Sequence, residues 1–366
     1  MVVGDRSTDI GDHGREARLT HRLGVEHPII QTGMGWVAGA SLTAATSAAG
    51  GFGILAGSTM DVQELMASLQ RVKARTSKPF GVNFNVDLPD LESRLGVTID
   101  QGVRVVSFAG PPTAQLVERL HREHVITIAT VGARRHAEKV ADLGVDIVIA
   151  QGGEGGGHTG SVPTSLLTPQ VVDAVGGRVP VVAAGGICDG RGVAAALALG
   201  ADGVAMGTRF LLTRESRVPD SVKRRYLATG VLDTVVTTAI DGRPQRVIRT
   251  PFVDRLENTN RLLGLLLALR SAKRFSRIGG HSLRELVTTG RSMHRTSLIP
   301  WTQVLTAANA PVLTRSVLVE GNEESGIFPS GQVVGLINDI PTVAELIDRL
   351  LSEAREARDR LVSVVI

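Results

Sequence analysis

The sequence predicts a parallel (β/α)8 barrel, or TIM barrel, with a mostly helical insertion between the eighth strand and the last barrel helix. Eight short runs rich in Val, Ile and Ala alternate with stretches of helical periodicity. Several runs end in glycine or in an uncharged polar residue, which is typical of strands whose carboxyl ends surround one site. A doubly wound open sheet is disfavoured, because no G-x-G-x-x-G segment with a later acidic residue follows the first run.

The predicted strands and helices follow one another along the chain. The strand runs cover residues 28–35, 52–57, 80–86, 103–110, 126–131, 146–152, 179–187 and 203–210. The helical patterns between them cover residues 61–75, 113–124, 134–143, 165–175 and 190–199. Short apolar runs that are enriched in β-branched residues and bounded by turn residues are typical of strands buried on both faces of a parallel sheet.

Three segments complete the predicted organisation. Residues 1–18 are polar and charged, and we expect them to form a flexible leader. Residues 213–325 are rich in Arg and show no strand alternation, so we expect a basic helical insertion or lid subdomain. The barrel itself then comprises residues 19–212 and 326–366. Its last helix is signalled by the Thr-x-x-Glu capping box of Thr342 and Glu345, which precedes an amphipathic pattern.

The composition narrows the class of protein. Hydrophobic residues make up 43% of the chain and aromatic residues 3%, a balance that argues against the aromatic platforms of single-stranded nucleic-acid binders. The single cysteine, Cys188, excludes an internal disulfide and fits a reducing compartment. No apolar segment has the length of a membrane span or the form of a secretory signal. We therefore expect a cytoplasmic protein with no nucleic-acid or membrane partner and, lacking clustered ligand motifs, no metal site.

Positive charge is concentrated in the predicted insertion. Residues 214–295 contain 17 Lys and Arg against 7 Asp and Glu, a local excess of +10. Such an excess attracts an anionic partner, although a solvated helical surface would have the same composition. The densest cluster is formed by Lys223, Arg224 and Arg225.

Two glycine turns at the ends of the last two strands predict a phosphate site. The seventh run ends at Gly185 and Gly186, and the eighth ends in Ala205, Met206, Gly207 and Thr208. Glycines let backbone N–H groups approach an anion closely, and barrels recurrently bind phosphate with the loops after strands seven and eight. The alternative is that these glycines only make tight turns.

The segment of residues 151–160, which follows the sixth strand, carries the main candidate for catalysis. It contains six glycines within ten residues, and these favour close approach of the backbone to a flat ligand. His158 is its only imidazole, and it can act as a general base or hydrogen-bond donor near neutral pH. Glu154 is open to several roles: contacting a cofactor, pairing with a basic residue, or capping the loop.

Two amides lie within otherwise apolar strands. Asn83 and Gln151 could each satisfy the donor and acceptor edge of a bound heterocycle. A buried amide without a partner is costly, so either a bound ring or the local backbone must pair with it.

Taken together, these motifs resemble the nitronate monooxygenase (2-nitropropane dioxygenase) superfamily, which also includes flavin-dependent enoyl-acyl-carrier-protein reductases. The resemblance rests on residues 28–35, 80–84, 151–160, 184–190 and 206–210. It implies FMN held by Asn83, Gln151 and Gly156, with its phosphate at Gly185, Gly186 and Ala205–Thr208, and with the backbone of Thr32, Gly33 and Met34 along the ring. His158 matches the active-site histidine of the family.

The resemblance implies an FMN-dependent oxidoreductase but leaves its reaction open. Oxidation of alkyl nitronates by O2 is placed modestly ahead. Reduction of an unsaturated CoA or acyl-carrier-protein thioester, with NAD(P)H as the electron donor, is the alternative, and the basic insertion favours it because such substrates are anionic. Thr159 stands where many nitronate oxidisers carry Arg, which weakens the nitronate assignment. A flavin-binding protein without turnover is a third, weaker hypothesis, and a homodimer is compatible with each.

Overall fold

The computed structural model describes residues 17–258 and 309–365. Eight parallel strands close into a barrel in the order β1-β2-β3-β4-β5-β6-β8-β9. These strands are β1 (Ile29–Gln31), β2 (Phe52–Ala56), β3 (Phe80–Phe84), β4 (Val105–Phe108), β5 (Ile126–Val131), β6 (Ile147–Gln151), β8 (Val181–Ala184) and β9 (Gly203–Met206). The barrel closes where Gln31 of β1 lies opposite Gly53 of β2 and Met206 of β9. The predicted fold class is confirmed, and each predicted strand run contains one barrel strand.

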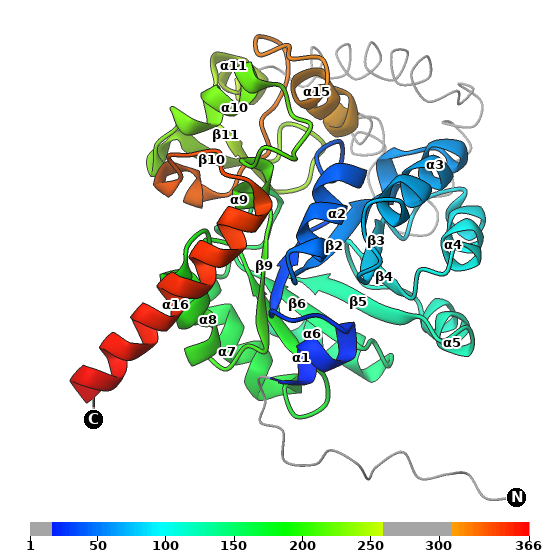
Figure 1. Ribbon diagram of the computed structural model, residues 1–366. Coiled ribbons are helices and arrows are strands. Elements are labelled where there is room, and N and C mark those ends of the chain that lie inside the picture. The colour runs from blue at the N-terminus through cyan, green and yellow to red at the C-terminus, as the bar shows by residue number, and fades with distance from the viewer. Residues whose placement is uncertain (1–16, 259–308, 366) are drawn as a thin grey trace, which may run out of the picture.

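Helices surround this barrel, as the alternating pattern predicted (Figure 1). They are α2 (Ala40–Ala48), α3 (Val62–Lys73), α4 (Leu91–Asp100), α5 (Ala114–Arg122), α6 (Arg134–Asp142), α7 (Thr164–Val175), α8 (Gly190–Ala198) and α16 (Val343–Val365). Helix α16 begins at the expected capping box, since the N–H of Thr342 donates to Glu345 (2.8 Å) and the N–H of Glu345 to the Thr342 hydroxyl (3.3 Å). It packs against α8 and α2, which is the place of the eighth barrel helix.

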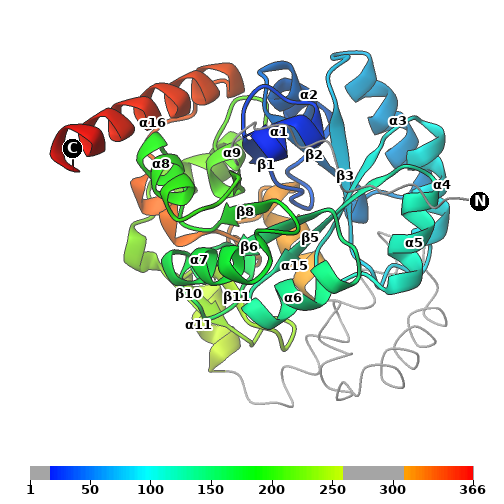
Figure 2. The same ribbon diagram turned by 90° about the horizontal axis from the view of Figure 1, so that it is seen from below.

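Helix α1 (Ala17–Leu23) covers the amino-terminal end of the barrel (Figure 2). Leu19 and Leu23 are buried with the inward-facing residues of the strands, and each such side chain stabilises the fold by about 1.5–3 kcal/mol. Arg18 forms an ion pair with Asp202 at 3.1 Å. The predicted boundary of the leader at residue 18 is therefore wrong by two residues, while residues 1–16 lie outside the described part of the chain.

The described part of the segment between β9 and α16 lies over the opposite, carboxyl end of the barrel (Figure 1). Its described part contains α9 (Thr208–Leu211), α10 (Asp220–Leu227), α11 (Pro251–Glu257) and α15 (Asn309–Leu318), with short 3-10 turns at Val231–Asp233 and Gln332–Leu336. The secondary structure of that part is mostly helical, as expected, but it also includes strands. Strands β10 (Thr234–Thr237) and β11 (Gln245–Ile248) form an antiparallel hairpin within it. Residues 259–308 of the predicted insertion lie outside the described residues, so the mostly helical character expected there stays a prediction.

The hairpin does not stand apart from the barrel. Strand β11 also pairs with β7 (Gly157–His158), a short strand inside the glycine-rich segment that follows β6. The resulting three-stranded sheet has the order β10-β11-β7. This pairing brings residues of the insertion against the predicted catalytic loop. No local pattern in the sequence indicated that contact.

Candidate active site

The strand ends that carry the predicted site residues meet at the carboxyl end of the barrel. Gly33, after β1, lies so close to β3 that a Cβ added to it would be 2.3 Å from the Cβ of Asn83. On its other side, a Cβ on Gly207 would lie 3.4 Å from both the Thr32 hydroxyl and the Met34 sulfur. Thr32, Gly33, Met34, Asn83 and Gly207 therefore form one continuous surface, and only glycine fits at position 33.

The glycine-rich segment lies next to the turn after β8. Gly185 and Gly186 both have left-handed backbone, with φ of 99° and 70°, a conformation that glycine adopts without the strain other residues incur. A Cβ on Gly185 would be 3.1 Å from the Gly152 carbonyl oxygen and 3.2 Å from the Gly155 nitrogen. The predicted phosphate turn and the predicted catalytic loop are therefore neighbours.

The turn after β9 continues this surface. Ala205 and Met206 are 1% and 2% exposed and their side chains belong to the core, so the predicted phosphate contact would be made by their backbone and stays a prediction. Thr208 lies at the turn, where its hydroxyl accepts a hydrogen bond from the Gly331 N–H at 2.9 Å. Gly331 in turn packs on Gly156, where an added Cβ would be 2.5 Å from the Gly331 nitrogen.

Glu154 has the capping role, one of the three left open by the sequence. Its carboxylate accepts from the N–H of Thr164 at 2.9 Å and from the Thr164 hydroxyl at 2.8 Å, at the first residue of α7. A carboxylate at a helix amino terminus is favoured by the helix dipole and satisfies unpaired N–H groups. The Glu154 carbonyl also accepts from the N–H of Gln332 at 2.9 Å, which ties the loop to the return segment.

His158 is paired with an acidic residue of the insertion. Its Nε2 lies 2.8 Å from Oδ2 of Asp241, which follows β10. The imidazole is 48% exposed, whereas the Asp241 side chain is 6% exposed. Burial raises the pKa of Asp241, but the hydrogen bond and charge of His158 and the Arg243 N–H outweigh it and hold that pKa below its usual range. The structure thus presents an accessible imidazole backed by an ionised carboxylate.

A second insertion residue holds the same loop by its backbone. Arg246 of β11 donates through Nε (3.1 Å) and Nη2 (3.0 Å) to the carbonyl oxygen of Gly153. Its Nη1 donates to the hydroxyl of Thr234 on β10 at 3.0 Å. Because one guanidinium bridges the loop and the hairpin, the two segments are fixed relative to each other.

Each of the two predicted amides has a hydrogen-bond partner for its nitrogen but none for its oxygen among the described residues. Asn83 donates through Nδ2 to the Ser107 carbonyl at 3.2 Å, and Gln151 donates through Nε2 to the His158 carbonyl at 2.8 Å. Among the described residues, neither amide oxygen accepts a hydrogen bond. Each oxygen can accept from an N–H at the edge of a flavin ring. These acceptors, together with the glycine turns, are a donor and acceptor set that fits a flavin phosphate and ring.

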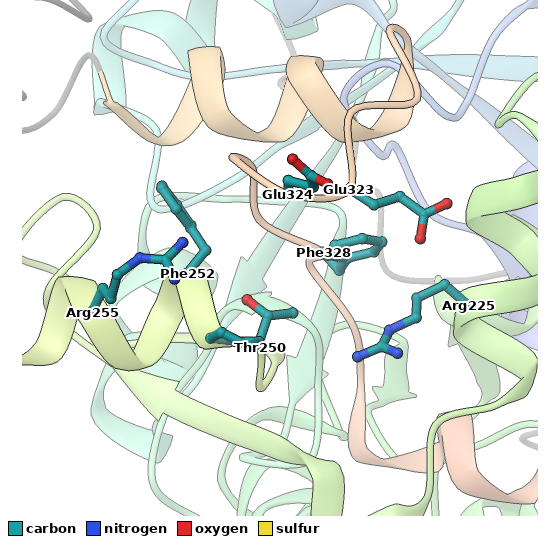
Figure 3. Close-up of a pocket in the computed structure, with 8 residues that line it drawn as sticks. Arg225, Thr250, Phe252, Arg255, Glu323, Glu324 and Phe328 are labelled. Atoms are coloured by element: carbon teal, nitrogen blue, oxygen red, sulfur yellow. The ribbon is translucent and has the colours of Figure 1, made fainter.

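The basic cluster of the insertion does not act as one surface. Lys223 is 3% exposed, and its Nζ donates to the carbonyl oxygens of Thr213 (2.9 Å) and Ser216 (2.7 Å). Arg225 instead lines a cavity of about 450 Å³ (Figure 3). The other lining residues are Thr250, Pro251, Phe252, Arg255, Glu323, Glu324 and Phe328. Because two arginines face two glutamates there, the cavity does not by itself favour an anion.

Cys188 is buried, and burial raises the pKa of its thiol to about 11, so it packs as a small apolar residue. Within residues 17–258 and 309–365, no three His, Cys, Asp or Glu side chains cluster in a way that could hold a metal ion. In that part of the chain no helix has the length and apolar character needed to cross a membrane.

Three functional candidates were missed by the sequence reasoning: Asp241, Arg246 and Gly331. Asp241 is 83 positions from His158, a separation at which no periodic pattern signals contact. A local signal for the hairpin did exist, since Asp241-Gly242 lies between two β-branched runs, and Asp-Gly is a common hairpin turn.

A closed parallel barrel with a histidine and glycine turns at its carboxyl end has its candidate site where TIM-barrel enzymes carry their active sites. Residues 16–353 match the family model described as nitronate monooxygenase, and the chain belongs to that family. It is therefore an oxidoreductase, as expected.

The relatives differ in the reactions that their names state. The chain is 53% identical over 337 residues, covering 92% of it and 95% of the relative, to the (3aS,4S,5R,7aS)-5-hydroxy-7a-methyl-1-oxo-octahydro-1H-indene-4-carboxyl-CoA dehydrogenase of Mycobacterium tuberculosis. It is 34% identical to a probable nitronate monooxygenase of Staphylococcus haemolyticus, covering 66% of this chain and 80% of that one. The solved structure of FabK from Thermotoga maritima superposes with a TM-score of 0.76 at 34% identity, covering 94% of this chain and 98% of that one.

Proposed function

We propose that this protein is an FMN-dependent dehydrogenase of a CoA thioester, with a bicyclic carboxylic acid as the acyl group. The observation that carries the proposal is the 53% identity to a dehydrogenase named for such a thioester, over 95% of that relative's length. A second dehydrogenase of the same name, from Rhodococcus jostii, is 51% identical over 94% of this chain. Both alignments cover more than nine tenths of this chain, so they include residues of the insertion, which supplies the partner of His158.

The geometry supports removal of a proton from carbon. His158 is accessible, and its carbonyl oxygen accepts from Gln151, one of the residues predicted to hold FMN. A C–H bond next to a thioester carbonyl is acidic enough for an imidazole to serve as general base. Because Asp241 is ionised and buried, it stabilises the imidazolium that results.

The residues that would hold FMN have separate tasks. Gly185, Gly186, Gly207 and Thr208 would hold the phosphate, and the amide oxygens of Asn83 and Gln151 would accept from the ring edge. When bound, FMN supplies the acceptor for the hydrogen that leaves the substrate as hydride. Turnover then requires an electron acceptor such as O2, NAD(P)+ or an added dye, so that the flavin returns to its oxidised state.

Oxidation of alkyl nitronates is the second candidate, and the sequence analysis placed it first. It is supported by the family and by the 34% identity to a probable nitronate monooxygenase. A neutral nitroalkane has an acidic C–H bond that His158 could deprotonate to the nitronate, whereas a nitronate supplied as substrate has already lost that proton. We place it second because that match covers 66% of this chain, against 92% for the CoA thioester dehydrogenase.

Steady-state assays with a redox dye as acceptor test the proposal. Purified holoenzyme would be given the hydroxylated hydrindanone carboxyl-CoA, its free acid or an alkyl nitronate. We expect dye reduction with the thioester, and none with the free acid because the thioester acidifies the neighbouring C–H bond. Turnover with the nitronate and none with the thioester would overturn the proposal in favour of the second candidate.

A further inference from the structure

Asp241 is held so rigidly that it can dictate the state of the imidazole beside it. Its Oδ1 accepts from the N–H of Arg243 at 3.1 Å, while its Oδ2 lies 2.8 Å from Nε2 of His158. Both carboxylate oxygens are therefore engaged, and the side chain is 6% exposed. A buried carboxylate with two fixed partners has little freedom to rotate away from the histidine.

The backbone of His158 is fixed from the same side. His158 pairs with Gln245 of β11 in the antiparallel ladder, and the N–H of Thr159 donates to the Pro244 carbonyl at 3.2 Å. Gln151 donates to the His158 carbonyl at 2.8 Å from the barrel side. Neighbouring residues thus fix the backbone of His158 and contact one of its two ring nitrogens.

We propose that Asp241 is a positioning residue that keeps His158 in the Nε2–H tautomer, so that Nδ1 is the nitrogen that takes the substrate proton. An ionised carboxylate only accepts hydrogen bonds, so Nε2 must carry the hydrogen that lies between the two groups. Among the described residues Nδ1 has no hydrogen-bond partner. Nδ1 therefore carries the lone pair that is free to accept a proton, and the ring that bears it is half exposed.

The proton balance follows from this tautomer. The C–H bond next to the thioester carbonyl breaks, its proton forms a bond to Nδ1, and the ring becomes an imidazolium. Nε2 keeps its hydrogen and its contact with Asp241, whose charge now faces a cation. The proton leaves from Nδ1 to water, because the imidazole is 48% exposed. Asp241 itself stays ionised throughout, and it never contacts the substrate.

Few other charges surround the imidazole. The elements packed against β7 carry Asp241, Arg243 and Arg246 on the hairpin, and the loop itself carries Glu154. Arg246 is engaged with the Gly153 carbonyl, and Glu154 with Thr164. Among the described residues, Asp241 is the charged group that forms a hydrogen bond and an ion pair with the His158 ring.

The direct test is nitrogen NMR of the uniformly 15N-labelled holoenzyme above the pH at which His158 titrates. The chain has nine histidines, and the signals of His158 are assigned by their loss in His158→Asn. We expect a pyrrole-type shift at Nε2 and a pyridine-type shift at Nδ1. The reverse pattern would overturn the proposal. This measurement needs no substrate, so it stands even if the proposed function fails.

Asp241→Asn supplies the kinetic test, with Asp254→Asn as the matched control. Asp254 lies on α11 of the same insertion and pairs with Arg249, and its side chain is 44% exposed and forms no ion pair with His158 among the described residues. Both variants lose one negative charge, and only the first should lower kcat by roughly 100-fold or more, with FMN affinity and KM little changed. The pH profile of kcat/KM should differ between Asp241→Asn and the parent and stay parental in Asp254→Asn, because only Asp241 faces the imidazole.

The inference rests on His158 acting as the proton acceptor in the proposed function. The kinetic arm therefore uses whichever substrate with a C–H proton to lose, the thioester or a neutral nitroalkane, turns over with the parent enzyme. Unchanged kcat and an unchanged pH profile in folded, FMN-bound Asp241→Asn would overturn the positioning role. If Asp241→Asn does not fold, the NMR pattern of the parent holoenzyme still decides the tautomer.

Discussion

Replacing Gly33 with alanine would test the close approach of β1 and β3 that forms one wall of the predicted flavin site. The new Cβ would lie 2.3 Å from the Cβ and 2.8 Å from the Cγ of Asn83. Carbon atoms at rest are about 3.5–4.0 Å apart, so Asn83 has to move by more than about 1 Å. Overpacking of this kind costs about 1–3 kcal/mol. If the strain is relieved by moving the amide off the flavin edge, the Kd for FMN rises roughly 5- to 150-fold.

The assay is titration of apoprotein with FMN, followed by quenching of flavin fluorescence. Gly96→Ala is the matched control, because a Cβ at Gly96 in α4 meets nothing within 4 Å. We expect that control to bind FMN like the parent and to be more stable by up to about 1 kcal/mol, since alanine favours a helix over glycine. A Gly33→Ala protein that folds and binds FMN with parental affinity would refute the proposed role of this wall.

Three further substitutions test separate parts of the account. His158→Asn should keep bound yellow FMN yet lose at least about 100-fold in turnover; equal loss of flavin would show that His158 belongs to the cofactor shell. Lys223→Met should lower the free energy of unfolding by about 1–3 kcal/mol, because it leaves two buried carbonyl groups unpaired, and the salt dependence of KM should not change; a flattened salt dependence would contradict its structural role. The pKa of Asp339 is lowered by its hydrogen bond with Arg349 and by Arg209, so its contribution to stability is present above about pH 3.9 and is lost as pH falls through the lowered value. Asp339→Asn should therefore flatten the acid limb of stability measured by urea unfolding, and an unaltered limb would count against that ion pair.

The barrel could be predicted from the sequence because its signals are local. Each strand is a short β-branched run buried on both faces, and the glycine turns after β8 and β9 stand where the barrel requires them. The capping box at Thr342 identified the start of the last helix even though more than a hundred residues separate it from β9. Capping boxes and glycine turns depend only on residues close in sequence, so a long insertion elsewhere does not change them.

The rest could not be predicted because it depends on contacts between distant segments. The β10–β11 hairpin carries a recognisable turn, but nothing in the sequence tells that its free edge pairs with the residues around His158. Asp241 and Arg246 act on the catalytic loop only through that pairing. The charge count predicted a basic surface on the insertion. That surface carries less positive charge than expected, because Lys223 is buried and two glutamates lie beside Arg225. Which charges face solvent is a property of packing, and composition does not report it.

The reaction itself is tested most directly by a single-turnover experiment without oxygen. FMN-bound protein would be mixed with the hydroxylated hydrindanone carboxyl-CoA in a stopped-flow instrument, and the visible absorbance of oxidised flavin followed over time. We expect rapid bleaching in the parent protein, and bleaching slowed about 100-fold or more in His158→Asn. Bleaching by an alkyl nitronate or by NAD(P)H, with none by the thioester, would contradict it.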